Sequence, residues 1–186
     1  MEKNNCLKKY IIIMACNSIQ LANIARDCEA NVGGIKKVWL TNYADNMFQL
    51  DSSGSSITGV TSGKTWYTYE FRKGTGSLTS TLNVDEAAGT NFIQSDLALQ
   101  FSRMETAKRT AIAALSIGEV CGIVLDCNGK YWALGFDEPL TTSSGVGQTG
   151  TARTDSNNYS ITLTDFSKSY PYEVAKEVVD GLQIGD

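Results

Sequence analysis

Two adjacent acidic pairs are the residues of this sequence best suited to acid–base chemistry. Asp85-Glu86 and Asp137-Glu138 are its only neighbouring carboxylates, and a pair of carboxylates is what a glycoside hydrolase uses to cleave a sugar bond. Neighbouring strand residues point to opposite faces, and each pair lies beside a proline or a polar turn. We therefore expect solvated turn charges. A hydrolase would need the fold to bring acidic residues together.

Histidine is absent from the 186 residues, so the chain lacks the commonest general base and the commonest zinc ligand. Ser-His-Asp and Cys-His catalysis are excluded. The five cysteines show no C-x-x-C spacing, which indicates neither a zinc site nor a redox pair. Cys121 and Cys127 would lie about 20 Å apart along one strand, at about 3.3 Å per residue, too far for a disulfide. Both are expected to be reduced, small apolar residues.

Two short motifs resemble ligand-binding loops by spelling alone. Gly145, Gly147 and Gly150 match a dinucleotide fingerprint, but no predicted strand leads directly into them and no predicted helix follows. Asp126-Cys127-Asn128-Gly129 resembles a calcium turn, yet it offers too few of the six to eight oxygens that calcium needs. The first motif is expected to be a flexible loop and the second a hairpin turn. We predict no cofactor, no metal and no enzymatic activity.

Charge is scattered, with 16 Lys and Arg against 20 Asp and Glu, a net charge of −4. The absence of a basic block argues against a surface that wraps nucleic-acid phosphates. At the N-terminus, Lys8-Lys9 precede the apolar stretch 10–16, which resembles a short lipoprotein signal with Cys16 as the acylated residue. The alternatives are a flexible arm or a true start at Met14. No other segment approaches the length needed to span a membrane.

A helix and a hairpin organise the middle of the chain. Ser102 and Glu105 form a capping-box pattern that predicts a helix over 103–117, stopped by Gly118, with an ion pair between Glu105 and Arg109. Its apolar face is Met104, Ala107, Ala111, Ile112, Ala114 and Leu115. Two apolar runs then flank Asn128-Gly129, which predicts a hairpin with a type I′ turn.

Alternating residues predict the remaining strands. Tyr67, Tyr69 and Phe71 share the expected buried face of one strand. The predicted strand ranges are 35–42, 57–61, 66–73, 78–84, 91–101, 119–126, 130–136 and 158–164. The expected fold is mainly β, a β-sandwich or barrel of about eight strands flanked by one α-helix. We divide the chain into an arm (1–31), a single domain (32–170) and an acidic tail (171–186) that forms a short helix or a docking arm.

Long polar segments and open sheet edges point to self-association. Residues 141–154 are almost wholly Gly, Ser and Thr, which is typical of a functional or disordered loop. Residues 51–64 form a second segment rich in turn residues. The chain has only two prolines, so little blunts its strand edges against pairing with another copy.

The order of these motifs resembles the tail-tube or ring-forming structural proteins of tailed bacteriophages, especially phages that infect Bacteroidetes. The resemblance covers the chain from about Met14 onward, and Met1–Ile13 precedes it. It is carried by residues 32–39, the Tyr67–Glu70 strand, the strand-to-helix join over 92–115, the hairpin over 126–135, and 147–150 followed by 159–164. Its specificity lies in the order of the motifs.

The resemblance implies a non-catalytic virion protein of the tail or neck, assembled in the host bacterial cytoplasm. Such proteins form stacked rings by inter-subunit sheet pairing, contact other tail, neck or portal proteins, and let DNA pass without specific binding; no membrane partner is expected. An acidic chain suits such a lumen. Expected contact residues are Ser144, Gly145, Gly147, Thr149, Gly150, Arg153, Ser53, Gly54, Glu105 and Arg109. The alternative is a surface lipoprotein or carbohydrate-binding module, with Cys16 acylated and Trp39 or Trp66 exposed for stacking.

Overall fold

The computed structural model describes residues 22–185, and the chain divides into two units, 1–30 and 31–186. Residues 22–30 contain no helix or strand and are exposed. The proposed acylation site, Cys16, lies outside the described residues. The second unit begins one residue before the predicted boundary, because Asn31 and Val32 hydrogen-bond to the side chain of Asn128, at 2.9 Å each.

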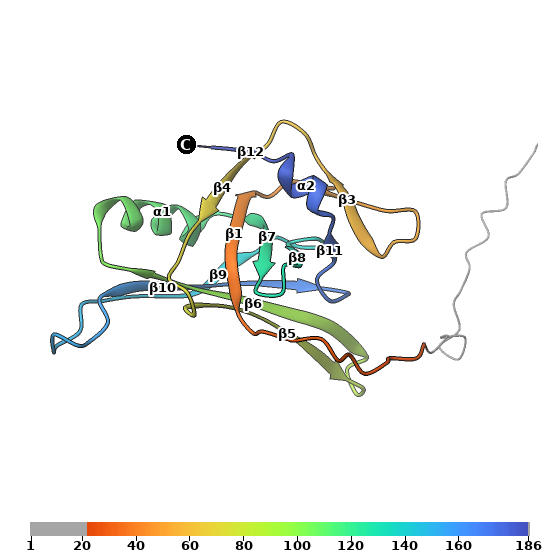
Figure 1. Ribbon diagram of the computed structural model, residues 1–186, viewed down its shortest axis with the longest axis horizontal. Coiled ribbons are helices and arrows are strands. Elements are labelled where there is room, and N and C mark those ends of the chain that lie inside the picture. The colour runs from red at the N-terminus through yellow and green to blue at the C-terminus, as the bar shows by residue number, and fades with distance from the viewer. Residues whose placement is uncertain (1–21, 186) are drawn as a thin grey trace, which may run out of the picture. The chain divides into compact units, whose positions relative to one another are not determined.

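Residues 31–185 form two sheets and two helices, which confirms the mainly β fold (Figure 1). The larger sheet contains, in spatial order, β12 (Gln183–Ile184), β4 (Thr65–Tyr69), β1 (Ile35–Asn42), β7 (Val120–Asp126), β8 (Tyr131–Leu134), β11 (Glu173–Val174), β3 (Ser56–Val60) and β2 (Phe48–Leu50). The smaller contains β5 (Gly76–Asp85), β6 (Thr90–Ser102), β10 (Asn158–Ser167) and β9 (Thr141–Gln148). The helices are α1 (Thr106–Ile117) and α2 (Lys176–Asp180).

Two apolar clusters lie against opposite faces of the larger sheet. Successive residues of β1 alternate between them, with Val38 and Leu40 in the first and Trp39 in the second. The first cluster lies between the two sheets and includes Leu97, Leu99, Leu163 and, from α1, Leu115. The second contains Phe48, Ile57, Trp66, Val174 and Val179. Strand β7 is buried over Val120–Val124 because both of its faces are covered.

The C-terminal segment belongs to the second cluster and is not a separate tail. Val174 of β11 and Val179 of α2 are 2% and 9% exposed. Strand β11 pairs in parallel with β3, and β12 pairs in parallel with β4. Residues 171–185 therefore belong to the same unit as the rest of the domain, and they contain a short helix, one of the two alternatives expected for them. Within residues 22–185, neither helix is long and apolar enough to cross a membrane.

Helix α1 begins three residues later than predicted, and the capping box does not form. Ser102 is the last residue of β6, and Arg103 turns the chain with a φ of 67°. The N-cap residue is Glu105, whose side chain makes no capping hydrogen bond. Glu105 instead forms ion pairs with Arg103 and Lys108 at 3.2 and 3.5 Å, rather than the predicted pair with Arg109.

The β7–β8 hairpin is confirmed, but its turn is not type I′. Only Gly129 of the Asn-Gly pair has a positive φ, 86°, and the Asp126 amide donates to the Lys130 carbonyl at 2.9 Å, so the loop has three residues. The Asp126 carboxylate accepts hydrogen bonds from the Asn128 and Lys130 amides and from Trp132 Nε1. Burial alone would raise the pKa of Asp126, but these bonds outweigh it and hold the pKa below its ordinary value.

The aromatic strand β4 is oriented differently from the prediction. Trp66 is 1% exposed in the second cluster, whereas Tyr67 is 48% exposed. Tyr69 and Phe71 are partly buried against the first cluster. Both faces of β4 therefore contact an apolar cluster. The alternation of residues alone could not predict which face is the more buried.

Candidate functional site

One carboxylate of each acidic pair accepts hydrogen bonds from backbone amides. Asp85 Oδ1 accepts hydrogen bonds from the Ala87 and Ala88 amides at 2.9 and 3.0 Å, within its own turn. Asp137 Oδ2 accepts one from the Lys168 amide at 2.8 Å. Among residues 22–185, no group of three or more Asp, Glu, Cys or His side chains is placed to hold a metal ion. Cys28, Cys121 and Cys127 are free thiols, and burial raises the pKa of Cys121 to about 12.

The predicted loop over 141–154 is largely a strand. Residues Thr141–Gln148 form β9, which pairs with β10 and places Ser144, Gly145 and Gly147 at a sheet edge. Only Thr149, Gly150 and Arg153 of the contact candidates lie in the loop that follows, where Asp155 Oδ2 accepts hydrogen bonds from the Thr151 and Ala152 amides at 2.7 Å each. The strand lacks an apolar alternation because seven of its eight residues are exposed and none is buried.

The remaining contact candidates separate into two places. Ser53 and Gly54 lie in the β2–β3 turn of the larger sheet, where hydrogen bonds from Ser53, Ser55 and Ser56 lower the pKa of Asp51 to about 2. Glu105 is exposed beside α1. Arg109 of α1 lies at a groove shared with Gly145 and Gly147. The structure thus brings together the α1 and β9 candidates and leaves the β2–β3 turn in the other sheet.

Both outer strands of the smaller sheet have an unpaired edge. The order β5-β6-β10-β9 is antiparallel throughout, and no strand among residues 31–185 pairs with the outer side of β5 or of β9. Strand β9 contains no charged residue and no proline, and Val146 is 55% exposed. Natural proteins usually protect such edges with charges, prolines or bulges. The edge strand β9 has one such feature, a bulge at Ser143, because Thr162 pairs with Ser144 and Leu163 with Thr142.

A groove of about 410 Å³ separates α1 from β9. The helix lies beside the strand, and Thr142 Oγ1 donates to the Leu115 carbonyl at 2.9 Å. The groove is lined by Arg109, Ile112, Ala113, Ser116, Thr142, Gly145, Val146, Gly147, Tyr159, Ser160 and Ile161. Only Leu115 of α1 is buried, so this flank of the helix is open.

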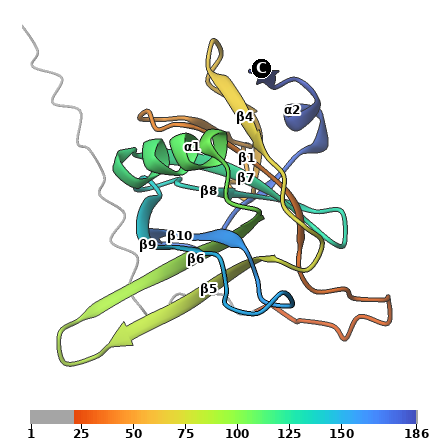
Figure 2. The same ribbon diagram turned by 90° about the vertical axis from the view of Figure 1, so that its left-hand side faces the viewer.

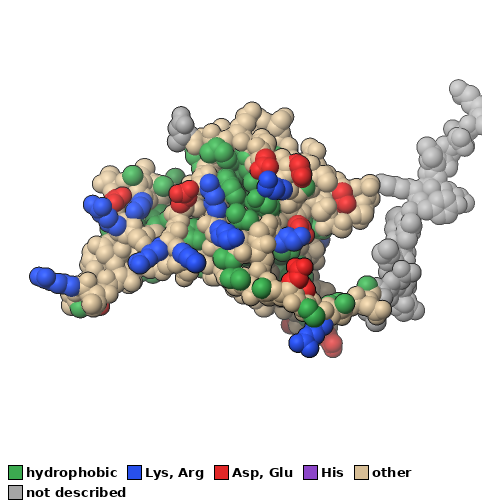
Figure 3. Space-filling view, in the orientation of Figure 1, with side chains coloured by type: hydrophobic (Ala, Val, Ile, Leu, Met, Phe, Trp, Pro, Cys, Tyr) green, Lys and Arg blue, Asp and Glu red, His purple; other side chains and the backbone are tan. Residues whose placement is uncertain are grey.

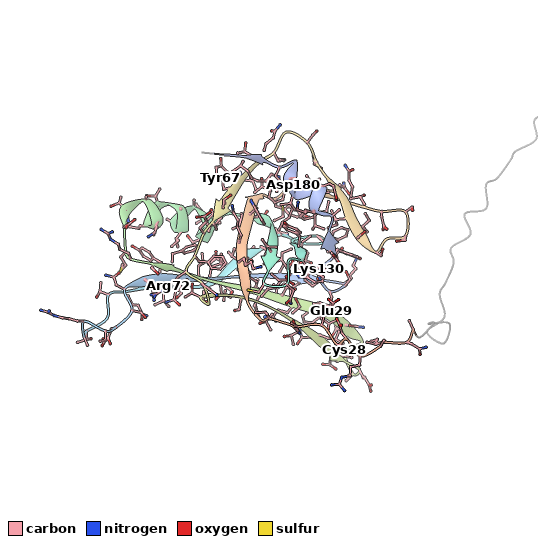
Figure 4. The ribbon with its side chains drawn as sticks, viewed as in Figure 1. Cys28, Glu29, Tyr67, Arg72, Lys130 and Asp180 are labelled. Atoms are coloured by element: carbon pink, nitrogen blue, oxygen red, sulfur yellow. The ribbon has the colours of Figure 1, made fainter. Side chains whose placement is uncertain are left out.

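A second groove, of about 240 Å³, lies on the other flank of α1. Ala111 and Ala114 face Tyr67 and Tyr69 across it. Figure 4 shows Tyr67 on β4, in the part of the fold next to α1. An alanine-rich helix with an open groove on each side has little of its surface covered within one chain.

The smaller sheet contains no cationic residue. None of the residues in β5, β6, β9 and β10 is Lys or Arg. Its face away from the first cluster is mainly hydroxyl and amide, with Thr79 opposite Asp96 and Thr81 opposite Gln94. Thr164 Oγ1 donates to Asp96 Oδ1 at 2.6 Å on that face. Figure 3 shows Lys and Arg side chains elsewhere, over β1, α1 and the connecting loops.

The far end of the β5–β6 hairpin carries exposed aliphatic residues that the sequence analysis did not identify as functional. Strand β6 pairs with β10 only as far as Ile93, and the hairpin extends beyond β9 and β10 (Figure 2). Leu82 and Val84 are 49% and 59% exposed there. Their shared face was predicted correctly, but sequence alternation cannot show where the covering layer ends.

Asp165 is a buried carboxylate between the two sheets. It is 3% exposed on β10, and its Oδ2 accepts a hydrogen bond from the Gly135 amide at 2.7 Å, just after β8. Its Oδ1 has no partner among the described residues. Burial raises the pKa of Asp165 above its ordinary value, and Asp137 and Asp96 add to the effect. Asp165 therefore connects β10 of the smaller sheet to the end of β8 in the larger sheet, which suits a structural role.

Comparison of the chain with protein-family models, with curated proteins and with solved structures found no match. The resemblance to ring-forming phage tail proteins therefore stays a prediction. The features with the clearest potential for function are the two open edges of the smaller sheet and the groove beside α1.

Proposed function

We propose that this chain is a virion structural protein that assembles head-to-tail into rings of a phage tail tube or neck, through the edges of its smaller sheet. The observation that carries the proposal is the pair of unpaired edges on one sheet, β5 on one side and β9 on the other. An edge of this kind is a template for pairing with another chain. A head-to-tail contact that closes by rotation gives a ring.

Strand directions support a continuous sheet between copies. Each neighbouring pair in β5-β6-β10-β9 is antiparallel, so β5 and β9 run in opposite directions. When β9 of one copy meets β5 of the next in the same orientation, the new pair is also antiparallel. A head-to-tail assembly thus keeps one hydrogen-bonding pattern around the whole ring.

The polar face of the smaller sheet supports a lumen for DNA. Besides the exposed Val146 and Phe166, it offers Ser, Thr and Gln side chains and no Lys or Arg, so it has no group with which to form a charge-assisted bond to phosphate. Asp96 and Asp85 on the strands add negative charge. Such a wall repels a polyanion mildly and does not hold it.

The binding-module alternative receives no support from the aromatic residues. Trp39 and Trp66 are 8% and 1% exposed, so neither offers a flat surface for a sugar ring. Tyr67 is exposed and lines a groove with alanines of α1, but its neighbour Tyr69 is partly buried against the first cluster.

The test is the native mass of the purified protein by light scattering, followed by negative-stain imaging of the same fraction. We expect rings or short tubes. Val146→Lys, which places a charge on the β9 edge, should leave a folded monomer. Ile117→Lys is the matched control, because Ile117 is 90% exposed on α1 and lies outside both edges; it should still form rings. A strict monomer at high concentration would overturn the proposal and favour the binding module.

A further inference from the structure

The apolar row on β5 continues beyond the core of its own chain. Leu78 lies opposite Leu97, which is fully buried, and Leu82 lies opposite Ile93, which is 3% exposed. Leu82 and Val84 themselves are about half exposed, on the same face of the strand. This face looks toward the first cluster, but the cluster ends before it reaches them. The chain therefore presents an aliphatic surface that nothing among residues 22–185 covers.

The groove beside α1 opens on the same face of the same sheet, at the opposite edge. Its floor includes Ile161, which lies opposite Leu99 on β6, a member of the first cluster. On β9 itself, Gly145 and Gly147 lie opposite Ile161 and Tyr159 and have no side chains. A Cβ added at Gly145 would meet only the Ser160 carbonyl, at 3.7 Å. A Cβ added at Gly147 would instead meet the Tyr159 ring at 2.8 Å. The groove is therefore open at Gly145, on the side where a neighbouring strand would lie, and is filled by Tyr159 at Gly147.

We propose that Leu82 and Val84 of one copy fill the groove between α1 and β9 of the next copy. When β5 pairs with β9 of a neighbour, the faces of the two sheets are continuous, so the aliphatic row of β5 lies on the same side as α1. Side chains of adjacent strands on one face contact each other, and aliphatic groups fit best beside glycine positions. The two exposed residues are spaced by two, as are Gly145 and Gly147.

Closure of the ring brings the hairpin end to the groove. Strands in a closed sheet must be staggered along one another. In one chain, Thr79 of β5 lies at the same level across the sheet as Thr141, the first residue of β9. Strand β5 continues for six residues beyond Thr79. If β5 of one copy is shifted toward α1 of the next copy, Leu82 and Val84 come to lie beside β9 of that next copy. The occupant is a second copy of this chain, since only continuation of the sheet presents both features on one face. The inference rests on the proposed ring.

Disulfide trapping tests the contact directly. Leu82→Cys and Ser116→Cys are made in separate chains in which Cys6, Cys16, Cys28 and Cys127 are serine, leaving only the buried Cys121. Under mild oxidation, an equal mixture should give a linked heterodimer from up to about half of the chains, which is the limit for random order in a ring, and neither chain should link to itself. One chain with both cysteines should give a ladder of multimers. Rings without these links, or Leu82→Cys homodimers from a two-fold contact, would overturn the inference.

A pair of charged variants measures the strength of the contact. Leu82→Asp with Val84→Asp should raise the protein concentration at half-assembly at least tenfold, because two carboxylates would enter an apolar groove. Thr58→Asp with Ser62→Asp is the matched control, with the same charges at exposed positions of β3 and of the turn after it in the larger sheet, away from both edges of the smaller sheet, and should change it less than threefold. If both double variants change the concentration at half-assembly equally, the proposed contact is overturned but the proposed ring is not. A monomeric wild-type protein would instead remove the ring itself.

Discussion

In the larger sheet, β1 and β7 have an apolar cluster against each face, whereas the smaller sheet has a cluster on one face and open edges on both sides. The larger sheet completes its burial within one chain, using the C-terminal segment as the cover of its second cluster. The smaller sheet leaves aliphatic residues and strand edges uncovered. The larger sheet therefore buries both of its faces within one chain, whereas the smaller sheet keeps one face and both edges free.

Removal of residues 171–186 should have the largest effect, a loss of unfolding free energy from the larger sheet. The deletion uncovers the second cluster and removes Val174 and Val179, whose burial contributes about 1.5 to 3 kcal/mol each, so about 3 to 6 kcal/mol of unfolding free energy is lost. Urea unfolding followed by tryptophan fluorescence measures it. The full-length chain is the control. A deletion variant with an unchanged midpoint would show that the C-terminal segment is a tail after all.

Leucine-to-alanine changes on adjacent strands of the smaller sheet should separate core from assembly surface. Leu97→Ala removes a fully buried side chain and should cost about 2 to 5 kcal/mol of unfolding free energy. Leu82→Ala, at a site that is 49% exposed, should cost less than about 1 kcal/mol in the monomer. Chemical denaturation at a concentration below assembly gives both values. Similar losses would mean that the hairpin end is buried within one chain.

Asp165→Asn should stabilise the domain at neutral pH by about 1 kcal/mol, because a buried charge with one unpartnered oxygen is replaced by a neutral amide that can still accept from Gly135. The pKa of Asp165 is raised in the folded state, so its favourable contribution is complete below the ordinary value of 3.8 and is lost as the pH rises through the folded-state pKa. The unfolding free energies of the variant and the wild type are measured at pH 4 and pH 7. Their difference should be smaller at pH 4 than at pH 7. A variant less stable at pH 7 would contradict this.

The smallest expected effect is a contrast between two aspartates, one from each sheet. Asp51, held by serine hydroxyl and amide donors in the β2–β3 turn, should titrate with a pKa of about 2. Its contribution to stability is present above its unfolded pKa and disappears as the pH falls through about 2, the reverse of Asp165. Carboxyl chemical shifts followed by NMR through an acid titration measure both. Ordinary pKa values at both sites would remove the contrast.

Sequence patterns predicted the elements that are stabilised by their own residues. Strand β6 follows its apolar alternation from Ile93 to Phe101, and the β7–β8 hairpin forms around Asn128-Gly129. The sequence patterns gave wrong predictions where contacts with another element of the fold determine the local structure. Ser102 does not cap α1, because β6 continues through it to pair with Asn158. The aromatic face of β4 was misjudged, because apolar groups approach both sides of that strand.

The candidate site was predictable only in part, for the same reason. Ser144, Gly145 and Gly147 were expected in a loop, because β9 has no alternation and is a strand only through its hydrogen bonds to β10. Arg109 was expected on an exposed helix face, but nothing local indicated that this face meets β9. The exposure of Leu82 and Val84 depends on where β10 ends, which is a property of another part of the chain.

The lack of Lys and Arg on β5, β6, β9 and β10 also has a thermodynamic consequence for any polyanion beside that sheet. Cationic side chains that neutralise phosphates release condensed counterions, and this release makes binding fall steeply with salt. A surface without cations releases none. The free energy of DNA along such a wall would therefore contain no counterion-release contribution from these strands.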